Sequence, residues 1–159
     1  MASQTCKLSE LPVGVHRMKI ESPQSVVHWE AAAAAVTAAV RWAEDAGLRV
    51  NVAVVDAGGN LAAFLRMPGG FLHSIDIAID KAYTAAGFGL ATSAWAEALA
   101  SHSPAVRDGL PRRPRMVCIG GGLPIRYEGH VIGGIGVSGG SDEQDEACAR
   151  AGLVAIGLR

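Results

Sequence analysis

Alanine and valine recur every three or four positions between residues 23 and 46, which is the spacing of one face of a helix. Ser22-Pro23 is a typical helix start, because serine caps the helix and proline fits its first position. Gly47 provides a stop. The pattern predicts a long helix over residues 23–46, whose alanine-rich side can lie close against a sheet.

Apolar and β-branched residues alternate in the segment that follows this helix. Residues 50–55 predict a strand, residues 56–60 are turn-forming, and residues 61–67 predict a second strand. Because the turn is short and rich in glycine, the two strands are expected to form an antiparallel hairpin. Pro68-Gly69-Gly70 then ends the second strand.

Helices and strands alternate irregularly in the rest of the chain. Ser141 and Gln144 have the spacing of a capping box, which marks the start of a terminal helix. Three prolines lie within residues 103–115, so this segment is expected to be an exposed loop. The other segments predict helices over 75–86, 93–100 and 142–158 and strands over 116–119, 123–126 and 131–137.

The order of elements, αββααβββα, is typical of an α+β protein within the broad α/β class. We expect a single domain over residues 1–159 in which residues 1–21 are irregular. An antiparallel sheet of about five strands, with helices largely on one face, follows from the runs of adjacent strands. The other face then needs cover, which a second subunit can provide.

The charge balance and the cysteines limit the partners and the compartment. The chain has 14 basic and 15 acidic side chains, and this leaves no basic surplus for nucleic acid. Its charge-free stretches are shorter than the roughly 20 residues of a membrane span, and residues 1–20 lack the apolar core of a secretory signal. Three cysteines without a CxxC pair predict neither a disulfide framework nor a zinc site. We expect a cytoplasmic protein.

Residues 134–140 contain two overlapping functional motifs, GxGxxG over 134–139 and GxSxG over 136–140. GxGxxG is typical of a dinucleotide site. Such a site also needs a further parallel strand that carries an acid about 20 residues later, and only 20 residues follow Gly139. GxSxG suits a hydrolase nucleophile, but no histidine follows Ser138. Tight strand packing is the simpler interpretation. A narrower hypothesis remains, in which Ser138 and Gly139 bind a carboxylate or phosphate at the start of the terminal helix.

The five histidines show no metal-binding spacing. His16 lies in the irregular segment, and His102 and His130 are expected at the surface. His28 and His73 are the better candidates, because each lies at a helix start beside apolar residues. A structural or surface role competes with iron ligation or proton transfer at both positions.

Lys81 lies on a flank of the apolar face of the helix predicted over 75–86, so its stem is expected to be partly buried. A buried ammonium needs a counterion or a ligand. Asp56, Asp76 or Asp80 can neutralise it, or it can bind an anionic ligand. Arg66, at a strand end beside a glycine-rich turn, also suits carboxylate binding.

Five segments in this order resemble one protein family. They are residues 54–61 (VVDAGGNL), Arg66-Met67, the A-x-x-K-A-Y-T-A sequence within 74–86, residues 120–125 (GGGLPI) and residues 133–139 (GGIGVSG). Together they resemble the GlcG/HbpS-like family (DUF336), also called haem-degrading domain proteins and related to the C-terminal domain of PduO. The resemblance covers about residues 22–158.

The resemblance implies a profilin-like, five-stranded antiparallel sheet with flanking helices, assembled as a homodimer and often as an octamer. Some members bind haem noncovalently, so haem or a related tetrapyrrole is the expected ligand. The resemblance does not place the axial ligand. From chemistry alone, His28 or His73 are the candidate iron ligands, with Tyr83 and Thr84 weaker.

An enzymatic alternative uses the same segment. Arg66, His73, Lys81 and Tyr83 lie close in sequence, so a cluster of them could bind an organic acid at Arg66 and move a proton through His73 or Lys81. The reaction would be that of a lyase, isomerase or hydrolase. A third hypothesis is an accessory subunit without a ligand.

Overall fold

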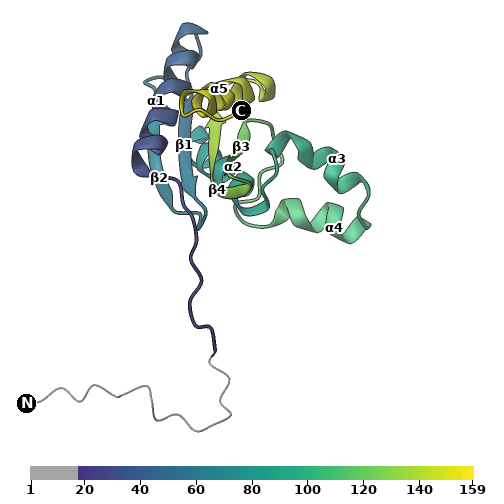
Figure 1. Ribbon diagram of the computed structural model, residues 1–159. Helices are drawn as coiled ribbons and strands as arrows, with labels where there is room; N and C mark the ends of the chain where they lie inside the picture. The colour runs from purple at the N-terminus through teal and green to yellow at the C-terminus, as the bar shows by residue number, and fades with distance from the viewer. Residues whose placement is uncertain (1–17) are drawn as a thin grey trace, which may run out of the picture.

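The computed structural model describes residues 18–159, and the predictions for His16 and Cys6 fall outside this range. The fold is of the α+β class, because its strands come in adjacent pairs that are separated by helices (Figure 1). The helices are α1 (Trp29–Asp45), α2 (Ser74–Phe88), α3 (Trp95–Ala100), α4 (Pro104–Gly109) and α5 (Asp142–Ala155), with 3-10 turns η1 (Thr92–Ala94) and η2 (Leu110–Arg112). The strands are β1 (Asn51–Asp56), β2 (Leu61–Arg66), β3 (Gly122–Tyr127) and β4 (His130–Ser138).

The sheet is antiparallel and has the strand order β2-β1-β4-β3. The expected hairpin is confirmed, with Asn51 opposite Arg66. The sheet has four strands where five were expected, because residues 116–119 form no strand. This segment is instead held by Thr84 of α2, whose hydroxyl accepts a hydrogen bond from the Val117 N–H at 3.1 Å.

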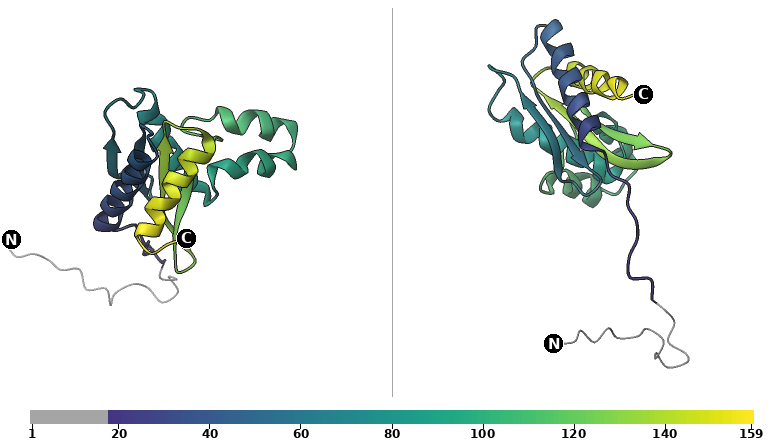
Figure 2. Two further views of the ribbon diagram at one scale, coloured as in Figure 1. Left: turned by 90° about the horizontal axis from the view of Figure 1, so that it is seen from above. Right: turned by 60° about the vertical axis from the view of Figure 1, so that its left-hand side comes forward.

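Helices cover both faces of the sheet, so the expectation of helices largely on one face was wrong. Figure 2 shows α1 and α5 beside each other on one face, over the core that contains Val52 and Val54. α2 lies on the other face, where Ala78 and Ala82 pack against Ala53. Alternation along β1 explains this arrangement, since successive side chains of a strand point to opposite faces. The sheet itself therefore needs no second subunit as cover.

Two helix predictions also need correction. α1 begins at Trp29, six residues after the expected start, because the Val27 N–H donates to the Ile132 carbonyl at 2.9 Å and so keeps the preceding chain extended. The expected loop over 103–115 contains α4, which starts with proline at its first position. α3 and α4 project from the body of the molecule (Figure 1).

Glycines in β4 let α2 approach the sheet closely. A Cβ atom on Gly134 would collide with the Ala82 carbonyl oxygen, and one on Gly136 would collide with the Ala78 carbonyl oxygen. Backbone of α2 thus occupies the space where strand side chains normally lie. This is the tight packing that was the simpler interpretation of the GxGxxG sequence.

Gly136→Ala is therefore expected to destabilise the protein by about 3 kcal/mol, because either α2 or β4 must move. Urea denaturation of the purified variant measures the loss. Gly109→Ala is the matched control, since no atom lies within 4 Å of the added Cβ. Equal stability of the two variants would contradict the close approach of α2.

Candidate functional site

The Lys81 side chain is almost fully buried, with 2 % of its surface exposed, and forms an ion pair with Asp145 of α5. Its Nζ lies 2.8 Å from Asp145 Oδ2 and donates a second hydrogen bond to the Val137 carbonyl at 2.9 Å. The other Asp145 oxygen accepts the Gly140 N–H at 2.8 Å. Both charges are thereby satisfied without solvent.

The ammonium completes the hydrogen bonding of β4 beyond Gly136, which pairs with the first residue of β3. The Val137 N–H donates to the Gly121 carbonyl, and its own carbonyl points to the same side of the strand, where Lys81 bonds it. Gly121 has φ +111, and a Cβ there would lie 2.6 Å from that of Asp145. The glycine-rich turn before β3 is thus shaped around the ion pair.

Lys81 therefore has an architectural role, and its Nζ is not placed to bind an anionic ligand. The expected burial of the stem is confirmed, but the counterion is Asp145 and none of the three aspartates considered from the sequence. Asp145 was missed because it lies 64 residues from Lys81 in the chain. Its position on the inner face of the predicted terminal helix was the available signal.

Arg66 and His73 lie at the two ends of a loop that joins β2 to α2. The Arg66 guanidinium donates to the Gly70 carbonyl at 3.0 Å, and the Asn51 amide donates to the Phe71 carbonyl at 3.1 Å. His73 is the N-cap residue of α2, without a side-chain capping bond, and its imidazole is exposed. Phe71 and Leu72 are 69% and 73% exposed. The loop thus presents an imidazole and two apolar side chains near an arginine.

Tyr83 lies at the opposite end of the β1–β2 hairpin from Arg66. Its ring packs against the turn at Gly59, and Arg66 ends β2. A six-residue strand is roughly 20 Å long, so the structure does not bring Tyr83 to Arg66. The Arg115 guanidinium lies 3.6 Å from the centre of the Tyr83 ring. Neither Tyr83 nor Lys81 joins the cluster that the enzymatic alternative requires.

Thr84 is buried and uses its hydroxyl within the chain. It donates to the Arg115 carbonyl at 2.9 Å while accepting from Val117. This threonine therefore fixes the segment that precedes β3. An iron-ligating role would require that segment to be displaced.

His28 caps α1 and is exposed. Its Nδ1 lies 3.4 Å from the Glu30 backbone nitrogen and 3.5 Å from the Glu30 carboxylate. The neighbouring Trp29 is 65% exposed, with its ring centroid 5.7 Å from that of the imidazole. His28 and His73 thus occupy equivalent positions at the starts of α1 and α2.

Ser138 and Gly139 do not offer an anion site at the start of α5. Ser138 is buried. The predicted capping box is confirmed, because the side chains of Ser141 and Gln144 each accept a hydrogen bond from the other residue's backbone N–H. Asp142, Glu143 and Asp145 add negative charge to the first turn. An incoming carboxylate would meet occupied N–H groups and repulsion from these acids.

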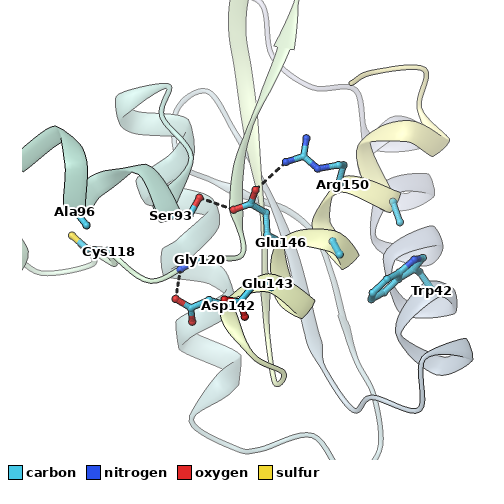
Figure 3. A pocket seen from close by; sticks show the side chains of 11 residues that line it. Trp42, Ser93, Ala96, Cys118, Gly120, Asp142, Glu143, Glu146 and Arg150 are labelled. Carbon is cyan, nitrogen blue, oxygen red and sulfur yellow. Dashed lines mark hydrogen bonds and ion pairs between the residues drawn. The ribbon is translucent and has the colours of Figure 1, made fainter.

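A hollow of about 770 Å³ lies beside α5 and contains none of the residues predicted for the site (Figure 3). Glu146 accepts hydrogen bonds from Ser93 at 2.6 Å and from Arg150 at 2.9 Å, so its carboxylate is already paired. Burial raises the pKa of Cys118, which disfavours the nucleophilic thiolate. Within residues 18–159, no group of three or more His, Cys, Asp or Glu side chains is placed to hold a metal ion.

Comparison with known proteins places the chain in a family. The family described as "Haem degrading protein HbpS-like" matches residues 27–154. This chain belongs to the HbpS-like family. An uncharacterised 15.0 kDa protein from the dhaT-dhaS intergenic region of Citrobacter freundii is 40% identical over 114 residues, which cover 69% of this chain and 80% of that protein. The resemblance inferred from the five segments is thereby confirmed.

Two solved structures of HbpS-like relatives confirm the fold. The Klebsiella pneumoniae protein ORFY, of family DUF336, has a TM-score of 0.81 and 31% identity, covering 89% of this chain and 98% of its own. The complex of PduOC with heme has a TM-score of 0.77 and 32% identity, and the match covers 84% of this chain and 97% of PduOC. In the described part of this chain, no helix has the length and apolar character to cross a membrane.

Lys81→Met is expected to lower the free energy of unfolding by about 3–5 kcal/mol, because it leaves the Asp145 carboxylate buried without its partner. Urea denaturation measures the loss. In Lys81→Met/Asp145→Leu no charge is stranded, so much of the stability should return. Arg150→Ala breaks an exposed ion pair and serves as the control, with an expected loss below about 0.5 kcal/mol. Additive losses in the double variant would contradict the coupling.

Proposed function

We propose that this HbpS-like protein binds haem or a related tetrapyrrole noncovalently at the β2–α2 loop, with His73 as the axial ligand. The exposed imidazole of His73 beside the exposed side chains of Phe71 and Leu72 is the observation that carries the proposal. Haem offers a flat apolar face, an iron that accepts a nitrogen ligand, and anionic propionates. The loop supplies a chemical partner for each of these features.

Arg66 is the cation that suits the propionates. It lies at the exposed end of β2, and its bond to the Gly70 carbonyl holds it near the loop. A guanidinium binds carboxylates through paired N–H donors. The bond from Asn51 to the Phe71 carbonyl limits motion of the loop, which lowers the entropic cost of binding. When bound, the iron would supply redox or oxygen chemistry, while these residues hold and orient the macrocycle.

His28 is the alternative axial ligand. Because its Nδ1 accepts the Glu30 N–H, the neutral imidazole carries its proton on Nε2, and this proton must leave before Nε2 can bind iron. Trp29 provides apolar contact there. We favour His73 because the acid of Glu30 would repel propionates, whereas Arg66 attracts them.

The family membership and the PduOC–heme complex support this ligand class. The enzymatic alternative is not part of the proposal, because the polar cluster on which it rests is not assembled. The Lys81 ammonium is paired with Asp145, and the Tyr83 ring packs against the turn at Gly59, at the opposite end of the hairpin from Arg66. The cytoplasmic location stays a prediction, as does the single domain over 1–159.

Hemin added to the purified protein should shift the Soret band away from that of free hemin. His73→Ala should weaken binding by about tenfold or more, because the nitrogen ligand is lost. Absorbance titration measures the dissociation constant. His102→Ala, which removes another exposed imidazole, should leave the titration unchanged.

Two results would contradict this assignment. A spectrum identical to that of free hemin would exclude haem as the ligand. Loss of the Soret shift in His28→Ala, with retention in His73→Ala, would move the iron to the start of α1. Arg66→Gln should weaken hemin binding without changing the band position, since it contacts propionates and not iron.

We also propose that the protein is a homo-oligomer, and that α1 and α5 form its interface. A hollow of about 640 Å³ between them is lined by alanines, including the exposed Ala33 and Ala34. Arg41 and Asp45 lie on the same surface, and neither takes part in the ion pairs within residues 18–159. A surface with both charges is complementary to a second copy of itself, and its alanines permit close helix approach.

Ala34→Arg is expected to dissociate the oligomer, because a long charged side chain would occupy the hollow where the second copy packs. Light scattering coupled to size-exclusion chromatography measures the mass at micromolar concentration. Ala100→Arg places the same side chain on the exposed end of α3 and should leave the mass unchanged. A wild-type protein of 16.4 kDa would contradict the proposed self-association.

A further inference from the structure

A separate hollow of about 350 Å³ lies between the C-terminal half of α2 and the segment that follows α4. Thr84 and Phe88 of α2 form one side, and Leu110 and Met116 face them from the other segment. His73 is at the opposite end of the 15-residue helix, roughly 20 Å away along its axis. This hollow is therefore distinct from the surface proposed for haem, and nothing in it depends on that proposal.

Two arginines give the hollow a positive edge. Arg115 is fixed, because its Nε donates to Asp80 Oδ1 at 2.9 Å and its guanidinium stacks on Tyr83. Its backbone has φ +64, a left-handed conformation that costs a non-glycine residue about 1 kcal/mol. Arg113 also lines the hollow and belongs to none of the ion pairs found in residues 18–159. The pair Arg115–Asp80 is neutral overall, so Arg113 supplies the net charge.

Gly87 lines the hollow, and no other atom of the protein occupies the space beside its Cα. It lies within α2, where alanine would be more stable by up to about 1 kcal/mol. A Cβ on Gly87 would meet no atom within 4 Å, so no neighbouring group requires glycine there. The backbone is open to the hollow at this position. A ligand that approaches the helix backbone would account for the missing methyl group.

We propose that this hollow binds a small organic carboxylate with a flat apolar body. The carboxylate pairs with the Arg113 guanidinium at the edge. The body lies over Gly87 and contacts Phe88 and Met116, while the Tyr83–Arg115 stack provides a fixed wall. A volume of this size takes a ligand with one ring or a short branched chain, and its mixed lining disfavours a bare inorganic anion.

Benzoate is the test ligand, with benzamide as its neutral analogue and inorganic phosphate as an anion without an apolar body. Isothermal titration calorimetry with the full chain should detect benzoate with a dissociation constant of about 1 mM or tighter. Backbone amide NMR signals of residues 87, 110, 112, 113, 115 and 116 should shift with benzoate. Benzamide and phosphate should bind at least about tenfold more weakly.

Arg113→Ala should weaken benzoate about tenfold, and its control Arg112→Ala should have little effect. Gly87→Ala should also weaken benzoate about tenfold while raising the melting temperature, because the methyl group favours the helix but fills the hollow. Gly109→Ala, which adds a methyl group in equally open space outside the hollow, should leave the affinity within about twofold.

Failure of benzoate to bind, or equal binding to wild type, Arg113→Ala and Gly87→Ala, would overturn the carboxylate site. Benzamide binding as tightly as benzoate would also overturn it, since the charge would then contribute nothing. Hemin titration of Arg113→Ala should match wild type. Failure of this site is therefore distinguishable from failure of the haem proposal.

Discussion

A buried ammonium and a buried carboxylate tie the two helical layers of this protein together. Lys81 belongs to α2 on one face of the sheet, and Asp145 belongs to α5 on the other. Each ion loses several kcal/mol of hydration on burial, which only a partner at close range offsets. The pair is favourable only while α2, α5 and the end of β4 keep their relative positions. It therefore fixes the arrangement of the elements around it.

Small residues make this arrangement sterically accessible. Gly134 and Gly136 let the backbone of α2 rest on β4, and Gly121 turns the chain past the ion pair. On the opposite face, Ala35 and Ala39 bring α1 close to the sheet and to α5. Burial and the nearby Asp145 carboxylate raise the pKa of Cys148 to about 12, because solvent is excluded where α5 packs against α1. Close backbone packing replaces the large aromatic side chains that this core lacks.

The chemistry available for ligands consequently lies at the two ends of α2. At its N-terminal end, the β2–α2 loop exposes His73 beside apolar side chains and Arg66. At its C-terminal end, Arg113 borders a hollow next to Gly87. Both regions are loops held by hydrogen bonds to rigid elements, which is where proteins commonly place binding groups. The haem-bound relative supports the class of ligand proposed for the first region, whereas both locations are inferred from this chain's own residues.

The sequence by itself determined the elements whose signals are local. The hairpin over 51–66, α2 and the capping box at Ser141 depend on turn residues, apolar spacing and caps within a few positions of each other. It also indicated the family, because the five segments occur in the family's order. Even so, α1 starts late, since a hydrogen bond from Val27 to Ile132 lies far outside any local window.

Only the tertiary structure decided which polar side chains meet. Residues 116–119 form no strand, and Thr84, more than 30 residues earlier, binds this stretch of chain by donating to the Arg115 carbonyl and accepting from the Val117 N–H. The cluster expected around Lys81 is absent, because the Lys81 ammonium is paired with the carboxylate of Asp145, 64 residues later in the chain. Arg113 was not foreseen, because its role depends on a hollow between distant segments. Local propensity acts over a few residues, whereas the pairing of buried charges depends on how whole layers pack.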